Sequence, residues 1–162
     1  MVRFTTPTIT TAASSASWSS PLSKLLQRLS DASKSGVYRV LRTDEIVDAT
    51  RGSALQLSRI RLSGAADKQA LMQRIADALE FPRWFGANWD ALEDCLGDLS
   101  WSKAAGHVLL IEGAAGLPAD ERGILLDILA SAAAGWMERK RPFFAVFADG
   151  SPELPELYRS RK

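Results

Sequence analysis

The sequence contains one cysteine and one histidine among its 162 residues. Because Cys95 has no second cysteine to pair with, an internal disulfide is impossible, which fits a reducing compartment. His107 has no evident nucleophile near it, so a structural or surface histidine is a better interpretation than a catalytic one. We expect Cys95, which shares an apolar helix face with Trp89 and Leu92, to be a buried and inert thiol.

Long apolar runs and an excess of charge of one sign are also missing. No stretch approaches the roughly 20 apolar residues that a membrane helix needs, and residues 1–22 lack the apolar core of a secretory signal. Lys and Arg total 20 against 19 Asp and Glu, a net charge of +1. The whole molecule therefore neither requires nor excludes a nucleic-acid partner. We predict a cytoplasmic protein that does not engage a membrane.

The length allows one domain with a sizeable core and additional segments. Ser, Thr and Ala dominate the first 20 residues, which is typical of a flexible arm. Pro and charged residues dominate the last 12, which favours a tail on the surface. The sequence thus predicts four parts in chain order: a flexible arm (1–20), an N-terminal extension with a short helix, a strand and a helical turn packed on the core (21–53), a main domain (54–150) and a surface tail (151–162).

The extension and the main domain have readable periodicities. In the extension, Pro21 suits a first helical turn, Val37 to Leu41 alternates like a strand, and Thr43 is a candidate helix cap. In the main domain, the hydrophobic periodicity predicts, in order, a strand at 55–62, helices at 67–80 and 88–96, a strand at 107–113, a helix at 118–139 and a strand at 143–148. Two apolar strands joined through a helix imply a right-handed parallel crossover. We expect an α/β fold with a small parallel sheet covered by helices.

The most informative segment runs from Phe81 to Trp101. With Glu80 it carries five acids against Arg83 alone, a local net charge of −4. On the predicted helix Asn88 is a good N-cap and Gly97 is well placed as the C-terminal stop. At about 100° per residue the helix has two opposite arcs. The apolar arc holds Trp89, Leu92, Cys95 and Leu96, and the acidic arc holds Asp90, Glu93 and Asp94.

The acidic arc can be interpreted as an ordinary solvated helix face or as a functional surface. Asp90 and Asp94 are one helical turn apart, and like charges at that spacing cost a few tenths of a kcal/mol. By pattern alone, a solvated helix face is the more common case. The alternative is a recognition surface for a cationic partner, with Trp84 in the preceding loop as an apolar anchor. A metal site lacks a third ligand at a suitable spacing, and a glycosidase pair on one helical turn lacks a cleft.

The residues of this segment resemble a family signature. They read aromatic-aromatic-Gly-x-Asn-x-Asp-Ala-Leu-x-Asp-Cys-Leu, without a gap, and the order of elements from about Leu55 to Ala148 is similar as well. The pattern resembles that of the barstar family of ribonuclease inhibitors. The matching positions are Trp84, Phe85, Gly86, Asn88, Asp90, Ala91, Leu92, Asp94, Cys95 and Leu96.

The resemblance implies a fold and a site. The fold would be a barstar-like three-stranded parallel sheet packed with helices. The helix from Asn88 and the loop before it would plug the active site of a secreted ribonuclease, with the acidic face in the place of substrate phosphates. Asp94 matches the central acid of the family, and Trp84 an aromatic that contacts a catalytic histidine of the enzyme. The expected partner-binding residues are Trp84, Phe85, Gly86, Asn88, Trp89, Asp90, Glu93, Asp94 and Gly97.

Three features depart from the family pattern. Glu93 replaces a Trp and makes the face more acidic, the Ala-rich stretch from Ala130 to Ala134 offers no further Glu, and a second cysteine is absent. The target could therefore be a different ribonuclease or a nuclease toxin with another basic active site, in an immunity or toxin–antitoxin pair. We expect no catalytic residue, no metal and no cofactor, and no direct binding of nucleic acid. The alternative is a non-inhibitory, nucleic-acid-associated regulator that uses the basic C-terminus, including the run from Glu138 to Arg141.

Overall fold

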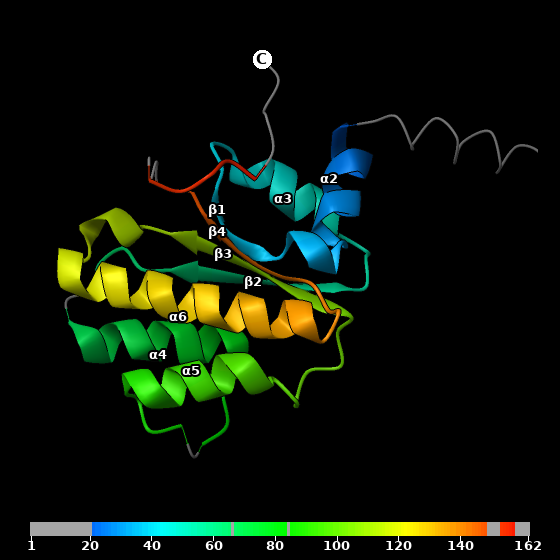
Figure 1. Cartoon of the computed structure of the whole chain (residues 1–162). Helices are drawn as coiled ribbons and strands as arrows, with labels where there is room; N and C mark the ends of the chain where they lie inside the picture. The colour runs from blue at the N-terminus through cyan, green and yellow to red at the C-terminus, as the bar shows by residue number, and fades with distance from the viewer. Residues whose placement is uncertain (1–20, 66, 84, 149–152, 158–162) are drawn as a thin grey trace, which may run out of the picture.

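The computed structural model describes residues 21–65, 67–83, 85–148 and 153–157, so the flexible arm predicted for 1–20 lies outside the described residues. Helices and strands are interspersed along the chain, with α4 and α5 in succession (Figure 1). In order they are α2 (Pro21–Leu29), the 3-10 turn η1 (Ala32–Lys34), β1 (Gly36–Arg39), α3 (Thr43–Thr50), β2 (Leu55–Arg61), α4 (Lys68–Leu79), α5 (Trp89–Asp98), β3 (Gly106–Glu112), the 3-10 turn η2 (Ala114–Gly116), α6 (Ala119–Glu138) and β4 (Phe143–Phe147).

The sheet has four parallel strands in the order β1-β4-β3-β2. The parallel α/β architecture was predicted, but the expectation of three strands was wrong. The strand predicted in the extension joins the sheet, with Gly36 opposite Phe144 and Arg39 opposite Phe147. Without β1, the fully buried strand β4 would expose one row of backbone donors and acceptors at a sheet edge. The extension removes that edge.

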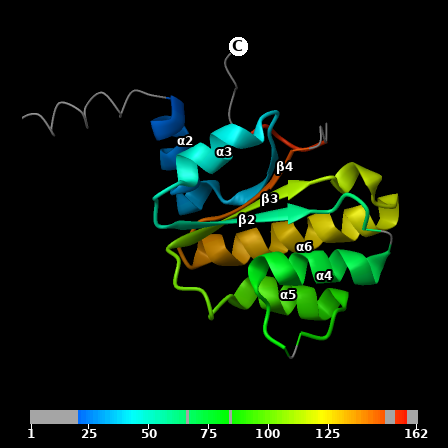
Figure 2. The same ribbon diagram turned by 180° about the vertical axis from the view of Figure 1, so that it is seen from behind.

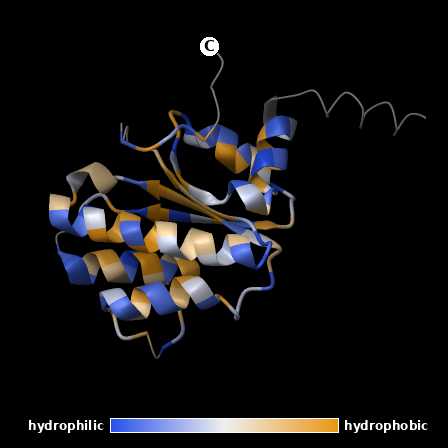
Figure 3. Ribbon diagram, viewed as in Figure 1, coloured by the Kyte–Doolittle hydropathy of each residue, from blue (hydrophilic) through white to orange (hydrophobic). Residues whose placement is uncertain are grey.

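Helices cover both faces of the sheet (Figures 1 and 2). α2 and α3 lie on one face, and α4, α5 and α6 lie on the other. Side chains alternate along the central strands: Leu109 and Phe143 face the three-helix side, whereas Val108 and Phe144 face α2 and α3. Because both faces are covered, β4 is apolar throughout and β3 is apolar from Val108 to Ile111 (Figure 3). This is why both strands read in the sequence as continuous apolar runs.

The extension contributes to the hydrophobic core. Leu29 of α2 and Ile46 of α3 are completely buried against the sheet. Thr43, the predicted cap, is instead the first residue of α3, and Arg42 occupies the cap position without a side-chain cap bond. Arg42 forms an ion pair with Asp44 in the first turn, so a charge interaction at the helix start takes the place of the predicted hydroxyl cap.

The described part of the tail, residues 153–157, lies beside β1. The Arg39 N–H donates to the carbonyl of Pro155 at 2.9 Å, and the Leu157 N–H donates to the carbonyl of Arg39 at 3.0 Å. Leu157 is completely buried with the side chains of α2 and α3. The sequence predicted a surface tail, and at Leu157 the chain is in the core instead, because the tail continues the backbone pairing of the sheet edge.

Gly113, at the end of β3, has a conformation and a neighbour that only glycine tolerates. Its φ is +83°, and a Cβ at this position would lie 2.3 Å from Ser63 Oγ and 2.6 Å from the Ser63 nitrogen. We expect Gly113→Ala to lower the free energy of unfolding by at least about 2 kcal/mol, through backbone strain and overpacking. Urea unfolding followed by circular dichroism measures the change.

Gly123→Ala is the matched control. Gly123 is exposed within α6, and a Cβ there would meet nothing within 4 Å. Because alanine favours a helix interior over glycine, this change should raise the free energy of unfolding by about 0.5–1 kcal/mol. Equal effects of the two substitutions would contradict the assignment of Gly113.

Candidate partner-binding face

Hydrogen bonds from α6 hold the C-terminal end of α5. The indole Nε1 of Trp136 donates to the Leu96 carbonyl at 2.8 Å, and Arg139 Nη2 donates to the Gly97 carbonyl at 2.6 Å. The Arg139 guanidinium also lies 4.0 Å from the centre of the Trp136 ring. The last carbonyls of a helix have no partner within the helix itself. Here the neighbouring helix supplies partners and fixes how α5 is turned.

Asn88 caps the N-terminal end of α5, as predicted. Its Oδ1 accepts a hydrogen bond from the Ala91 N–H at 2.8 Å, and Asp90 lies in the first turn. Gly97, the predicted stop, lies inside the helix, so that prediction was wrong. The helix continues to Asp98, and Leu99 takes the left-handed C-cap conformation with a φ of 45°. Leu99 is 2% exposed, so burial of its side chain decides where the helix ends.

The apolar arc of α5 faces the core. Leu92, Cys95 and Leu96 are completely buried, and Trp89 is partly buried against the same core cluster. Burial raises the pKa of the Cys95 thiol, and the charges of Asp94 and Asp98 raise it further. Because the thiolate is the reactive form, Cys95 is a structural residue with little reactivity.

The acidic arc of α5 faces solvent. Asp90, Glu93 and Asp94 are all exposed. Within the part of the chain that the structure describes, none of the three forms an ion pair. Glu93 reaches the neighbouring helix, where Ser131 Oγ donates to its Oε2 at 3.2 Å. The fold thus presents three carboxylates on one surface, which we call the acidic face, and the described residues pair no cation with them.

The loop before α5 is built on an aromatic cluster. The Phe81 ring makes edge contacts with Phe85 at 4.9 Å and Trp101 at 5.9 Å, measured between ring centres. Phe85 is partly buried against the core, whereas Gly86 is exposed beside Asn88. A Cβ on Gly86 would come within 3.2 Å of Asn88 Nδ2, so a side chain there would press on the cap.

The structure brings together most, but not all, of the expected site residues. Gly86, Asn88, Asp90 and the rest of the acidic face adjoin at the start and middle of α5. Gly97 lies nine residues beyond Asn88, about 13 Å along the helix, and its carbonyl is engaged by Arg139. Trp84 lies outside the described residues. Phe85 and Trp89 pack inward and so support the face from beneath.

The basic run after α6 is engaged with the fold. Arg139 bonds to the Gly97 carbonyl, and Arg141 Nη2 donates to the Ala104 carbonyl at 2.6 Å. Both guanidinium groups lie against the Trp136 ring, at 4.0 and 5.5 Å from its centre. Sequence reasoning considered these arginines as a candidate nucleic-acid contact and missed this role. The one available signal was the position of Trp136, on the predicted apolar face of α6 and one turn before the basic run.

His107, at the start of β3, is a buried residue. It is 2% exposed, its ring lies 5.6 Å from that of Trp136, and its Nδ1 has no hydrogen-bond partner among the described residues. Burial, aided by the nearby Arg141 cation, lowers the pKa of His107 from 6.5 to about 4. The imidazole is therefore neutral at physiological pH. Within the described ranges, no group of three or more His, Cys, Asp or Glu could hold a metal ion.

Comparison with known proteins identifies the family. The sequence matches the family described as Barstar (barnase inhibitor) over residues 55–148, more than half of the chain. The chain therefore belongs to the barstar family, whose members are ribonuclease inhibitors rather than enzymes. The match begins at β2 and ends just after β4, so α2, β1 and α3 precede it. No curated protein matches the sequence. Of the helices described, none combines the length and apolar character needed to cross a bilayer.

The low pKa of His107 makes stability depend on pH. As the pH falls below 6.5, the unfolded chain binds a proton at this residue while the folded chain does not, until the pH nears 4. Stability is therefore intact above the unfolded pKa and is lost as the pH falls toward the folded one. We expect the free energy of unfolding to drop by about 2 kcal/mol between pH 7.5 and 5, measured by urea unfolding.

His107→Gln is the control, because it removes the titrating group and should flatten this pH range. The carboxyl groups of Asp31, Asp44 and Glu153 have lowered pKa values and lose their contribution only at more acid pH. A pH-independent wild-type stability from 7.5 to 5 would contradict a buried, neutral His107.

Proposed function

We propose that this protein is an intracellular inhibitor or immunity protein that binds a ribonuclease, or a ribonuclease-like toxin, and blocks its basic active site. The acidic face of α5 and the loop before it form the blocking surface. The protein acts by occupying the site and performs no catalysis. The observation that carries the proposal is an exposed set of carboxylates without an ion-pair partner among the described residues, on a helix whose two ends are held by hydrogen bonds.

The electrostatics explain why the partner should be cationic. Asp90 and Asp94 repel each other across one turn, and in the described chain no cation relieves that repulsion. Burying unpaired carboxylates in an interface is costly, so a stable complex requires matching cations from the partner. The active site of a ribonuclease, which binds phosphates, presents such cations. Family membership supports a nuclease as the partner.

The other proposed partner-binding residues divide by position. Glu93 extends the acidic face toward α6 through its bond to Ser131. Gly86 and Asn88 present the exposed backbone and cap at the start of the helix. We propose Trp84 as the apolar anchor, and Phe85, Trp89 and Gly97 as residues that shape or border the contact.

The alternative function, binding nucleic acid through the basic C-terminus, has weaker support. Arg139 and Arg141 donate to backbone carbonyls and lie against Trp136, so these two cations are committed to the fold. A nucleic-acid regulator should bind RNA directly, with an affinity that falls steeply with salt. The inhibitor should show no such binding in an electrophoretic or fluorescence titration.

Replacement of the central acid tests the proposal. We expect Asp94→Ala to weaken binding to the inhibited ribonuclease by at least about 2 kcal/mol, because a cation of the partner would lose its counter-charge. The fold should remain intact, since Asp94 is exposed and forms no ion pair in the described chain. The measurement is the inhibition constant in an RNA-cleavage assay. Barnase is the first enzyme to test, followed by ribonucleases captured from culture medium of the source organism.

Asp48→Ala is the matched control, an exposed acid of α3 on the opposite face of the sheet from α5. It changes the net charge equally and should leave the inhibition constant within about twofold, as expected for a surface charge remote from the interface. Equal affinities of the wild type and Asp94→Ala for the same ribonuclease would contradict the assignment of the acidic face as the binding surface.

A further inference from the structure

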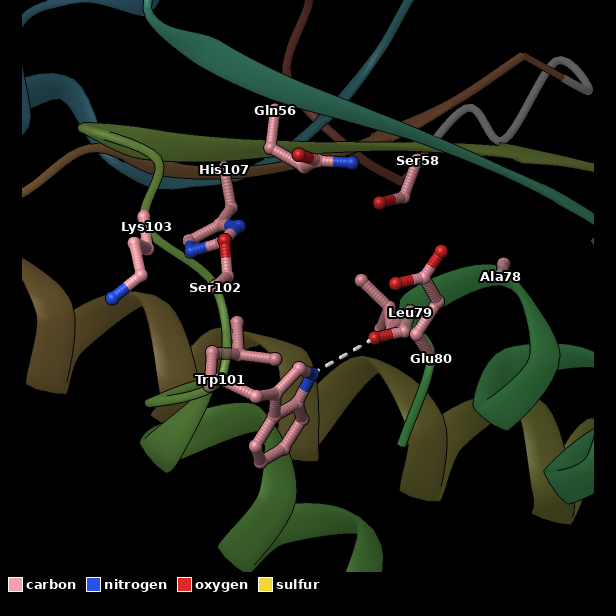
Figure 4. A pocket seen from close by; sticks show the side chains of 10 residues that line it. Gln56, Ser58, Ala78, Leu79, Glu80, Trp101, Ser102, Lys103 and His107 are labelled. Atoms are coloured by element: carbon pink, nitrogen blue, oxygen red, sulfur yellow. Dashed lines mark hydrogen bonds between the residues drawn. The ribbon is translucent and has the colours of Figure 1, made fainter. Parts of the chain in front are cut away.

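A second feature lies apart from the acidic face, between the sheet and the end of α4. A pocket of about 200 Å³ opens there, with Gln56 and Ser58 of β2 and His107 of β3 on the sheet side. The end of α4 and the loop after α5 form the opposite wall, as Figure 4 shows. The volume is below the roughly 300–1,000 Å³ of pockets for drug-sized ligands. The pocket therefore suits a group of a few heavy atoms.

The walls of the pocket are held in place. The indole Nε1 of Trp101 donates to the Leu79 carbonyl at 3.1 Å, which ties the loop after α5 to the last turn of α4 (Figure 4). The Trp101 ring is in turn packed edge-on against Phe81. A pocket bounded by such fixed elements is pre-formed, which lowers the entropic cost of binding.

A buried nitrogen without a partner indicates that the pocket can bind a polar group. His107 is 2% exposed and its Nδ1 is buried without a hydrogen bond in the described structure. Ser58 is 4% exposed and lines the same space. Buried polar atoms are paired in the large majority of cases, because an unpaired one costs about 1–3 kcal/mol. A neutral imidazole can offer one acceptor nitrogen and a hydroxyl can offer its oxygen, so both groups can receive donors from a ligand.

The charge of the pocket selects the kind of ligand. Glu80 extends its carboxylate toward Ser58 (Figure 4) and forms no ion pair among the described residues. The other charged lining group, Lys103, is exposed and extends away from Glu80 in the same view. An anion would meet a carboxylate and a neutral imidazole, which disfavours phosphate. A planar cation with several N–H groups could donate to both oxygens of the Glu80 carboxylate. It could also donate to two neutral acceptors, the His107 imidazole and the Ser58 hydroxyl.

We propose that this pocket binds a guanidinium group, with Glu80 as the bidentate anion and His107 and Ser58 as neutral acceptors. The group belongs either to a small guanidino compound or to an arginine side chain of a bound peptide or protein. The site is separate from the acidic face and does not depend on the proposed inhibition.

The single histidine makes the experiment direct. The imidazole ¹⁵N signals of the full chain belong to His107 alone, because the sequence holds one histidine. Methylguanidinium and the peptide acetyl-Gly-Arg-Gly-amide are titrated separately, with acetyl-Gly-Lys-Gly-amide as the comparison cation. We expect both guanidinium probes to shift the His107 signals saturably. Tighter binding of the peptide would identify an arginine side chain as the natural group, and tighter binding of methylguanidinium would identify a small compound.

Two variants decide the role of Glu80. Glu80→Gln keeps the shape of an exposed side chain and should weaken guanidinium binding about tenfold, the loss expected for one charge-assisted pair. Asp127→Asn, an exposed acid outside the pocket, should leave the affinity unchanged. No shift of the His107 signals, equal binding of the lysine peptide, or full binding by Glu80→Gln would each overturn the proposal.

Discussion

The attachment of α5 to α6 is the interaction on which the candidate site depends. The Trp136 indole donates to the Leu96 carbonyl in a buried position, and Arg139 donates to the next carbonyl along the helix. A hydrogen bond of this kind contributes about 1 kcal/mol net, whereas an orphaned buried carbonyl costs about 1–3 kcal/mol. These bonds, with the buried Leu92 and Cys95, fix the rotation of α5. The carboxylates are exposed because the rest of the helix has only one satisfactory orientation.

The second constraint is that a parallel sheet must be covered on both faces. Three helices cover one face, and the family match includes all of them. The other face requires α2 and α3, whose Leu29 and Ile46 are buried against β3 and β4. The extension therefore completes the core and closes the edge at β4. This arrangement leaves α5 on the far side of the molecule, where a large partner can approach it without meeting the extension (Figure 2).

Sequence reasoning succeeded where structure is local and periodic. The Asn88 cap, the two arcs of α5 and the apolar strands each follow from a few neighbouring residues, and the structure confirms them. Sequence reasoning failed where contacts between segments far apart in the sequence determine the structure. Gly97 has the right residue type for a helix stop, but burial of Leu99 carries the helix further. The strand of the extension was predicted, but its place in the sheet was not, because it pairs with an edge of β4 that exists only in the assembled sheet.

The acidic face and the pocket also differ in how far apart in the sequence their residues lie. The acidic face could be predicted because its carboxylates lie on one helix. The roles of Arg139 and Arg141 could not, because their acceptors are backbone carbonyls about 40 residues away. The pocket beside His107 draws its walls from two strands, the end of a helix and a loop. No periodicity marks such a convergence, and a lone histidine in an apolar strand gave no sign of an unpaired nitrogen.

The most direct test of the central claim is a hydrogen-exchange map of the protein with and without a ribonuclease that it inhibits. The account predicts slower amide exchange on binding along α5, from Trp89 to Asp98, and in the loop before it, with α2 and α3 unchanged. Protection confined to α2, α3 or the β2 edge, with α5 exchanging as in the free protein, would contradict it. Failure to inhibit any basic-site ribonuclease would contradict it equally.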